Sequence, residues 1–383
     1  MRALFIGSDP SLFTPESPAR LRMQEYAAAI GTLFIISPAP RDADAMYARG
    51  VQEGNLTIIS VKGGKLLALF WLMRCAKRCI REQGIEIVSA QDPFEHGYVA
   101  LRAVRGTETK LHIQVHTDFA SPWFTRSAVM RAAKVPMPLL NAVRLRIADA
   151  VIPRADGIRA VSERIQSSLV ARYGDTLPPV SVIPIATSPT LPQALPLPPH
   201  TFAFALMTVG RLEPEKRIED IIDAIARIHR TYPSVGLFVV GEGRSRAALE
   251  RRARALGLTD HVVFLGWRTD ALALMRSAQA YIQASAYEGY GRTLLEAALV
   301  RLPIITTDVG IVGEVFTGYE DVLVAPPGDP AALAVHIQSL VEDVQARSML
   351  AMHAEQKVQA HLASVLDQPA RIANELQETM NRA

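Results

Sequence analysis

Short apolar segments alternate with helix-forming segments along almost the whole chain, and this alternation limits the possible folds more than any other feature. The predicted strands of the first half are 2–7, 32–37, 56–60, 85–90, 111–117, 157–162 and 180–184. Those of the second half are 204–210, 235–241, 262–266, 280–285, 302–307 and 322–326. Amphipathic helices, such as those predicted over 217–232 and 245–258, lie between them. This pattern predicts parallel sheets that are covered by helices on both faces.

A proline-rich stretch, residues 186–200, separates two such α/β halves. Its prolines stand at positions 189, 192, 196, 198 and 199. Proline fixes φ and removes a backbone donor, so we interpret the stretch as a stiff linker. We therefore predict an α/β fold of two Rossmann-like domains, over 1–198 and 199–365, with a C-terminal helix at about 366–383 that packs back on the first. Two such domains would leave a cleft, and open α/β sheets bind ligands at the carboxyl ends of their strands.

The charge of the chain is unevenly distributed. Residues 1–198 carry 23 Lys and Arg against 16 Asp and Glu, whereas the whole chain carries 41 against 38. The first domain is therefore basic, which suits an anionic partner. No apolar run approaches the roughly 20 residues of a membrane span, and the first residues form a short strand rather than a signal peptide. We expect a cytoplasmic protein with no nucleic-acid partner.

Two turns of the second half carry residues that suit phosphate. Gly210, Arg211 and Lys216 follow a predicted strand and come just before a helix, where a guanidinium, an ammonium and the helix amino end could face phosphate oxygens. Gly241 and Gly243 follow the next strand. Each turn has a simpler explanation. The first could be a surface loop with solvated charges, and the second a tight strand-to-helix turn.

The segment EGYGRTLLEA, residues 288–297, combines two carboxylates with two glycines. Gly289 and Gly291 allow backbone amides to approach a ligand, and the predicted helix begins with Arg292, Thr293 and Leu294, whose free N–H groups suit a diphosphate. Glu296 and Glu288 could then each accept hydrogen bonds from sugar hydroxyls. Alternatively, Glu288 is a solvated loop residue and Glu296 a favourable charge in the first helical turn.

With these motifs the chain resembles the retaining GT-B glycosyltransferases of family 4. The resemblance rests on GRLEPEK, VVGEG, VVFLGW, EGYGRTLLE and TTDVGIVGEV, which occur in order within 203–330. It implies that Arg211 and Lys216 hold the donor diphosphate, that Glu296 binds ribose, and that Glu288 with the 289–291 loop faces the sugar. Gly266 and Trp267 would lie near the base, although a turn and a core indole explain them equally well.

The first half carries fewer indications. Its first strand is followed by a single glycine, Gly7, and then by a proline-containing loop, 8–20, where the family often has a glycine-rich loop. His116 ends a predicted strand, as does a family histidine that lies beside the transferred sugar, and Asp118 follows two residues later. Asp92, Glu95 and His96 could bind the acceptor, but a capped helix start accounts for them as well.

Two basic apolar segments of the first half could lie on an anionic membrane or pack on the sheet as ordinary helices. Their basic residues are Lys62, Lys65, Arg74, Lys77, Arg78 and Arg81 in the first, and Arg126, Arg131, Lys134, Arg144 and Arg146 in the second. Because many members of the family act on lipid-linked acceptors, the resemblance makes a peripheral position at the membrane plausible.

The resemblance implies a hexosyltransferase that moves a sugar from a UDP- or GDP-sugar to a glycan or lipid-linked acceptor, with retention of configuration and without an essential metal or other cofactor. The predicted catalytic residues are His116, Arg211, Lys216 and Glu288. The predicted substrate-binding residues are Asp118, Gly210, Gly241, Gly243, Gly266, Trp267, Gly289, Tyr290, Gly291, Arg292, Thr293, Leu294 and Glu296. The alternatives are a nucleotide-sugar epimerase of the same architecture and a nucleotide-sugar-binding protein without turnover.

Overall fold

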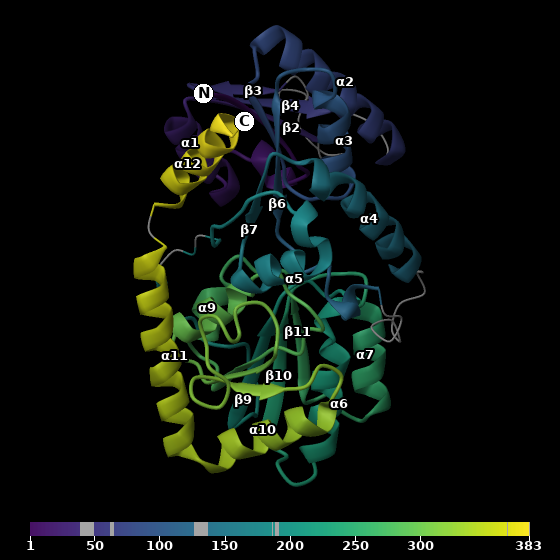
Figure 1. Ribbon diagram of the computed structural model, residues 1–383. Helices are drawn as coiled ribbons and strands as arrows, with labels where there is room; N and C mark the ends of the chain where they lie inside the picture. The colour runs from purple at the N-terminus through teal and green to yellow at the C-terminus, as the bar shows by residue number, and fades with distance from the viewer. Residues whose placement is uncertain are drawn as a thin grey trace. The chain divides into compact units, whose positions relative to one another are not determined.

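The structure is a computed structural model that describes residues 1–38, 50–61, 65–125, 137–185, 187, 191–365 and 367–382 (Figure 1). The chain divides into two compact units. Unit 1 comprises Met1–Ala120, Leu139–Pro184 and Asp367–Ala383, and unit 2 comprises Ser121–Pro138 and Ile185–Leu366. Each unit has its own sheet, and the predicted strands of each half are present in it.

The described residues of unit 1 form an eight-stranded sheet with the order β3-β4-β2-β1-β5-β6-β7-β8. The strands are β1 (Arg2–Ile6), β2 (Thr32–Pro38), β3 (Val51–Glu53), β4 (Leu56–Val61), β5 (Ile87–Ala90), β6 (Lys110–Val115), β7 (Gly157–Ala160) and β8 (Val180–Val182). All neighbours pair in parallel except β3, which pairs antiparallel with β4. The sequence does not predict β3, because its three residues VQE carry no run of apolar residues.

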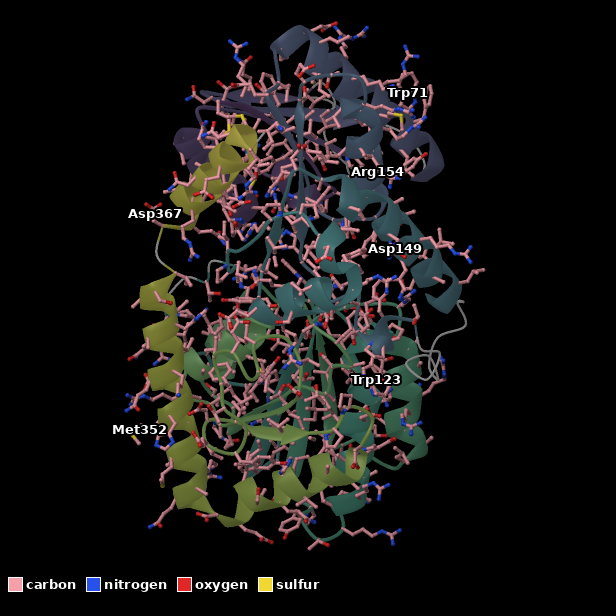
Figure 2. The ribbon with its side chains drawn as sticks, in the orientation of Figure 1. Trp71, Trp123, Asp149, Arg154, Met352 and Asp367 are labelled. Carbon is pink, nitrogen blue, oxygen red and sulfur yellow. The ribbon has the colours of Figure 1, made fainter. Side chains whose placement is uncertain are left out.

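The helices of unit 1 are α1 (Pro18–Ile30), α2 (Lys65–Gln83), α3 (Glu95–Val104), α4 (Met137–Val151), α5 (Glu163–Tyr173) and α12 (Gln368–Asn381), with 3-10 turns at Pro10–Phe13, Ile152–Arg154 and Gly174–Thr176. The C-terminal helix α12, which follows Asp367 in Figure 2, packs beside α1. Ile372 and Leu376 join the hydrophobic core on this face of the sheet, and the Tyr26 hydroxyl donates to Gln368 Oε1 at 2.8 Å. The last helix is therefore part of the first unit's core.

Unit 2 contains a six-stranded parallel sheet with the order β11-β10-β9-β12-β13-β14 among its described residues. The strands are β9 (Phe204–Val209), β10 (Val235–Val240), β11 (Val262–Gly266), β12 (Ala280–Ile282), β13 (Ile304–Thr307) and β14 (Leu323–Ala325). The helices are α6 (Ile218–Ile228), α7 (Arg246–Ala255), α8 (Ala271–Met275), α9 (Arg292–Leu299), α10 (Pro330–Glu342) and α11 (Val344–Ser364), with 3-10 turns at Pro122–Phe124 and Pro214–Lys216.

Helix α6 illustrates how the sequence pattern fixes packing in unit 2. Its isoleucines recur at helical spacing, and all of them are buried against the sheet: Ile218, Ile221, Ile222, Ile225 and Ile228. Burying a side chain of this size stabilises the fold by about 1.5–3 kcal/mol relative to exposure. The glutamate and aspartate at the start of the helix also complement its dipole. The stripe therefore holds the loop before α6 at a defined edge of the sheet.

In each sheet the chain first adds strands on one side of its first strand and then continues on the other side, which creates one topological switch point per sheet. In unit 1 the chain reverses between β1 and β5, and in unit 2 between β9 and β12, which are neighbours in the sheet although 70 residues of sequence separate Val209 from Ala280. Both are the Rossmann arrangement, in which ligands bind outside the carboxyl ends of the strands at the point of reversal. In unit 2 this point lies where the loops after β9 and β12 begin.

Candidate functional site

The loop after β9 fits tightly against the loop after β10. Gly210 N–H donates to Val240 O at 3.0 Å, and a Cβ at Gly241 would lie 1.9 Å from Gly210 O. A Cβ at Gly243 would likewise lie 2.4 Å from Leu212 O. Only glycine fits at these two positions, because neighbouring backbone fills the space of a side chain. This packing supports the tight strand-to-helix turn as the explanation of Gly241 and Gly243. Their contact with a substrate stays a prediction.

The loops after β9 and β12 meet at the point where the strand order reverses. Lys216 Nζ forms an ion pair with Glu288 Oε1, which also accepts a hydrogen bond from Ser285 Oγ at 2.8 Å. The Ala286 N–H donates to Glu215 O at 2.8 Å, which fixes the two loops to each other through their backbones. The side chains of Lys216 and Glu288 are 21% and 14% exposed. Two predicted catalytic residues thus form one partly buried pair.

Arg211 has a different environment. Its side chain is 73% exposed, and Nη2 lies 3.2 Å from Glu215 Oε1 within the same loop. An exposed ion pair of this kind contributes little to stability, so the guanidinium is able to exchange its partner for another anion. Gly210 next to it is open, since a Cβ there would contact only Lys216 Cε at 3.9 Å.

Helix α9 begins at Arg292, as the sequence predicts. Gly291 precedes it with φ of +89°, a left-handed conformation that favours glycine, and Leu294 N–H donates to Gly291 O at 2.9 Å. In the described part of the chain, the N–H groups of Arg292 and Thr293 have no hydrogen-bond partner. The first turn of α9 therefore presents two free donors, at the positive end of the helix dipole.

Glu296 lies one turn into α9. Its Oε1 accepts from Arg292 Nε at 2.8 Å, while the Thr293 hydroxyl donates to Gln283 Oε1 at 3.1 Å. Burial raises the pKa of the Glu296 carboxyl, and the charge and hydrogen bond of Arg292 oppose that shift. The carboxylate is therefore held at the start of the helix by a cation that is itself half exposed.

Three predicted substrate contacts are buried, and the side chains of two of them, Tyr290 and Leu294, pack inside unit 2. The Tyr290 ring is buried and its hydroxyl lies 2.7 Å from His361 Nε2 of α11, and Leu294 is fully buried. Gly289 is buried as well. These residues could reach a substrate only through their backbones, because the side chains of Tyr290 and Leu294 belong to the core of unit 2 and Gly289 has none. An aromatic residue between two glycines does not reveal from sequence which way it points.

Gly266 ends β11 with φ of +70°, and Trp267, the first residue of the turn that follows, is 71% exposed. The predicted turn is present, but the indole is not in the core, so that simpler explanation of Trp267 is wrong. An exposed indole is available for stacking. Its place beside a base stays a prediction.

The two predicted site residues of unit 1 follow β6. His116 comes directly after the last strand residue, Val115, and is partly buried, with Nε2 at 3.2 Å from Gln114 Oε1. Asp118 is buried two residues later. Sequence reasoning did not identify Gln114 as the partner of His116, nor Ser285 as the partner of Glu288. Polar residues inside otherwise apolar strand segments were the available indication.

The residues after β5 form a helix start. Asp92 Oδ1 accepts from the N–H groups of Phe94 and His96 at 2.8 and 3.3 Å, and its other oxygen pairs with the His96 ring. Burial raises the pKa of Asp92, but the hydrogen bond and charge of His96 and the N–H groups of Phe94 and His96 together outweigh burial and lower the pKa. Glu95 accepts from Arg144 Nε of α4 at 2.9 Å. Of the two explanations, the capped helix start is the one that these contacts support.

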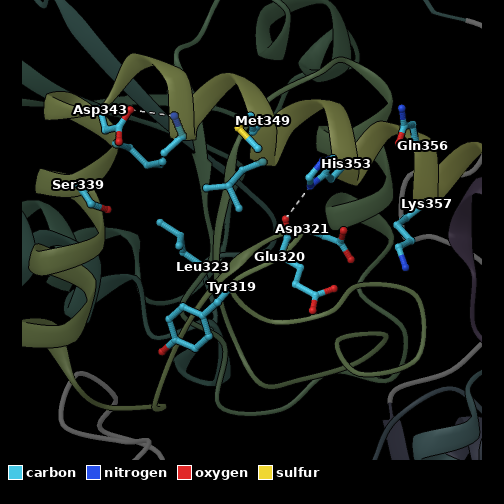
Figure 3. A pocket seen from close by; sticks show the side chains of 13 residues that line it. Tyr319, Glu320, Asp321, Leu323, Ser339, Asp343, Met349, His353, Gln356 and Lys357 are labelled. Carbon is cyan, nitrogen blue, oxygen red and sulfur yellow. Dashed lines mark hydrogen bonds between the residues drawn. The ribbon is translucent and has the colours of Figure 1, made fainter.

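A separate pocket of about 660 Å³ lies between β14 and α11 in unit 2 (Figure 3). Tyr319, Asp321 and Met349 are among its lining residues, and His353 Nδ1 lies 3.1 Å from Glu320 O. Tyr319 and Asp321 precede β14, so the pocket is at the amino end of this strand. The loops that carry Lys216 and Glu288 are at the carboxyl ends, and the pocket is therefore not the candidate site.

Comparisons with known proteins agree with these features. Residues 12–189 match the family described as Glycosyltransferase Family 4, and residues 200–357 match Glycosyl transferases group 1. The glycogen synthase of Mycobacterium tuberculosis is 30% identical over 210 residues, which are 54% of this chain and 51% of that protein. The chain thus spans about half the length of this curated relative.

Two solved structures share the fold over nearly their whole length. Sucrose-phosphate synthase from Thermosynechococcus elongatus is similar with a TM-score of 0.79 at 20% identity, covering 99% of both chains. Anabaena HepE in complex with UDP-glucose is similar with a TM-score of 0.74 at 20% identity, covering 98% of this chain and 100% of that one. The predicted α/β fold of GT-B type is confirmed. The chain belongs to the group 1 glycosyltransferases of family 4.

Proposed function

We propose that the protein transfers a hexose from a UDP- or GDP-sugar to a glycan or lipid-linked acceptor, with retention of configuration. The observation that carries the proposal is the joining of the loops after β9 and β12 by the Lys216–Glu288 pair, with Glu288 in the loop that leads into α9 and its free amides. These groups combine a cation and amide donors for phosphate with carboxylates for hydroxyls. Anabaena HepE, which has the same fold, is in complex with UDP-glucose.

The roles of the residues follow from what each can donate or accept. The Lys216 ammonium, the exposed Arg211 guanidinium and the amides of Arg292 and Thr293 stabilise the charge that develops on the leaving diphosphate. Glu296 accepts from the ribose hydroxyls. Glu288 accepts from hydroxyls of the donor sugar, and His116 is a residue of unit 1 for which we predict a substrate contact. Because a donor phosphate oxygen can take the acceptor proton on the face that the diphosphate leaves, no protein nucleophile is needed.

Phosphate stabilisation by Lys216, Arg211 and helix amides replaces a divalent cation, so we expect turnover to survive chelation. The full-length protein is incubated with UDP- or GDP-sugars and candidate acceptors, with and without EDTA, and the anomeric configuration of the product is determined by NMR. Equal rates and a retained configuration are expected. A rate that EDTA abolishes and Mg²⁺ or Mn²⁺ restores would contradict the metal-independent mechanism.

The same incubation separates the alternatives. An epimerase converts the donor sugar in the absence of acceptor, and a binding protein returns both compounds unchanged. We do not favour the epimerase, because the other ion pairs described for these loops, among them Arg211–Glu215 and Arg244–Glu213, each contain an arginine, which stays protonated and cannot act as a base.

A second part of the proposal concerns the acceptor side. Helix α2 exposes Phe70 and Trp71, and the Arg74 guanidinium lies 5.8 Å from both ring centres (Figure 2 labels Trp71). Arg78, one turn further along, is also exposed. Exposed aromatic rings interleaved with arginines suit the interface of an anionic bilayer. We therefore propose that α2 holds unit 1 at a membrane surface.

Two further findings bear on the membrane. Helix α4 exposes Leu139 and Val143 beside basic residues. No helix in the part of the chain that the structure describes is long and apolar enough to cross a membrane. The predicted basic residues Lys62, Arg126, Arg131 and Lys134 lie outside the described residues, as does Pro189 of the linker, and the side chain of Lys65 is not described either.

Sedimentation with liposomes tests the role of α2. The protein is expected to sediment with anionic vesicles at low salt and to be released as salt rises, since exposed charges are screened beyond about 8 Å at physiological ionic strength. The Phe70→Ser/Trp71→Ser variant should lose most of this binding. Val335→Ser, at an equally exposed apolar position of α10, serves as the matched control and should bind as the wild type does. Equal sedimentation with neutral and anionic vesicles would speak against the proposal.

A further inference from the structure

A group of polar side chains crosses the core of unit 1 on one face of its sheet. His112 and Gln114 occupy alternate positions of β6 and therefore share a face, as does His116 just beyond the strand. The strand register pairs His112 with Ser89 of β5, and Gln114 with Arg159 of β7. Apart from His116, which is partly buried, all are buried. Buried polar groups are costly unless hydrogen-bonded, so their bonding pattern is informative.

Arg159 fixes the orientation of the Gln114 amide. Its Nε and Nη2 donate to the carbonyls of Ile183 and Pro184 at 3.0 and 3.2 Å, and its Nη1 lies 3.0 Å from the terminal atom of Gln114 assigned as Oε1. A guanidinium has only donors, so the Gln114 atom that faces it must be the oxygen. The amide nitrogen then points away and donates to Ser89 Oγ at 3.0 Å.

The guanidinium is itself held in place by the C-terminal helix. The Tyr26 hydroxyl hydrogen-bonds to Arg159 and donates to Gln368 Oε1 of α12 at 2.8 Å. Gln368 Nε2 donates to Pro184 O, the same carbonyl that receives a bond from Arg159. With three nitrogens engaged and 3% of the residue exposed, Arg159 has no freedom to turn away from Gln114.

The orientation of Gln114 determines which nitrogen of His116 carries a proton. His116 Nε2 lies 3.2 Å from Gln114 Oε1, the oxygen that already accepts from Arg159. An amide oxygen can only accept, so Nε2 must donate an N–H to it. In a neutral imidazole one nitrogen donates and the other accepts, which leaves Nδ1 with a free lone pair. Among the described residues, Nδ1 of His116 has no partner.

The surroundings also keep the ring neutral. A protonated His116 would place a second cation on the carbonyl oxygen that Arg159 already shares. Burial, together with the charges of Arg159 and Arg22, lowers the pKa of His116 to about 3, and Asp92 opposes that shift. In the part of the chain that the structure describes, these are the charged groups that act on the ring. The histidine is therefore an acceptor at Nδ1 throughout the physiological pH range.

We propose that Gln114 and Arg159 are positioning residues that hold His116 as the Nε2–H tautomer, so that Nδ1 accepts a hydrogen bond from a hydroxyl of the sugar being transferred. The proposal rests on the proposed function only for the identity of that hydroxyl. The tautomer follows from contacts within unit 1. Arg159 acts through Gln114, and neither residue is assigned a contact with the substrate.

Long-range nitrogen-15 NMR of the full-length protein, labelled at histidine, tests the tautomer without substrate. The His116→Gln variant identifies the signal of His116 among the nine histidines. We expect a protonated Nε2, a bare Nδ1 and no titration between pH 5 and 8. A protonated Nδ1, or an equal mixture of tautomers, would overturn the proposal.

Substitutions on the two sides of the Gln114 amide show whether the effect is specific. Gln114→Leu removes the acceptor, and the single tautomer should be lost. Gln114→Glu keeps an acceptor but adds a negative charge, so the ring should retain Nε2–H and begin to titrate at higher pH. Ser89 contacts the Gln114 amide only at its nitrogen, so the Ser89→Ala variant should leave the His116 signal unchanged. If Ser89→Ala alters the signal as much as Gln114→Leu does, the network has only a structural role.

Turnover provides the second readout. Gln114→Leu should reduce kcat by about 10- to 100-fold, the scale of a misplaced positioning group, without weakening nucleoside diphosphate binding. Gln114→Glu should recover part of that loss. Unchanged kcat in a folded Gln114→Leu variant would refute the assigned role of Nδ1. A wild-type protein that forms no glycoside with any donor would refute the proposed function instead, and the NMR result would be unaffected by it.

Discussion

Replacing Lys216 with methionine is expected to weaken the binding of nucleoside diphosphates by about 10- to 150-fold, which corresponds to the roughly 1.5–3 kcal/mol of a charge-assisted hydrogen bond. Methionine keeps the length and apolar stem of the side chain, so the change isolates the ammonium. The loss has two parts. The phosphate loses its cation, and Glu288 is left partly buried without its partner, which places an uncompensated negative charge in the site. Calorimetric titration with UDP and GDP measures the effect.

Two comparisons make the experiment specific. Arg211→Ala should cost less than Lys216→Met, because the Arg211 side chain is 73% exposed and its interactions are more strongly screened. Arg268→Ala removes another exposed arginine of unit 2, which pairs with Asp270 at 2.6 Å, and should leave nucleotide affinity as it is. If folded Lys216→Met binds UDP and GDP as the wild type does, the ammonium is not part of the diphosphate site.

The elements of the fold were predictable because their patterns are local. A run such as LFVV or IIT identifies a buried parallel strand, and the prolines of 186–200 exclude regular structure there. The start of α9 at Arg292 was predicted directly after Gly291, and the structure shows a left-handed backbone at this glycine. These are properties of a few consecutive residues. The sequence therefore indicated which segments form strands and where the helix with free amides begins.

The contacts of the site were not predictable, because they join distant parts of the chain. Lys216 and Glu288 are 72 residues apart, and their pairing depends on β9 and β12 being neighbours in the sheet. The sequence motifs predicted that each of the two residues contacts the ligand, but not that the two residues contact each other. The exposure of single residues was not predictable either. Trp267 and Tyr290 are both aromatic residues beside a glycine, yet Trp267 is exposed, whereas Tyr290 is buried and hydrogen-bonds to α11.

The network around His116 was missed for a related reason. In the strand HIQV, alternate polar residues resemble a half-exposed strand. The face that carries them is instead covered by α12, from the far end of the chain, and Glu375 of that helix lies 3.9 Å from His112 Nε2. Only the fold shows that these polar residues are buried, and burial is what gives Gln114 and Arg159 a fixed orientation.

The two carboxylates of EGYGRTLLEA are expected to respond differently when each is changed to glutamine. Glu296→Gln should weaken the intact donor and the free nucleoside diphosphate alike, by about 10- to 150-fold, because both contain the ribose and charged hydrogen bonds contribute roughly 1.5–3 kcal/mol. Glu288→Gln should weaken the intact donor by a similar factor through its sugar. The same change should leave the free nucleotide unaffected or bound more tightly, because Glu288 competes with phosphate for the Lys216 ammonium. Titration of both variants with UDP-glucose or GDP-mannose, and with UDP or GDP, measures the four affinities. If Glu288→Gln loses as much free-nucleotide affinity as Glu296→Gln does, the assignment of Glu288 to the sugar and Glu296 to the ribose is wrong.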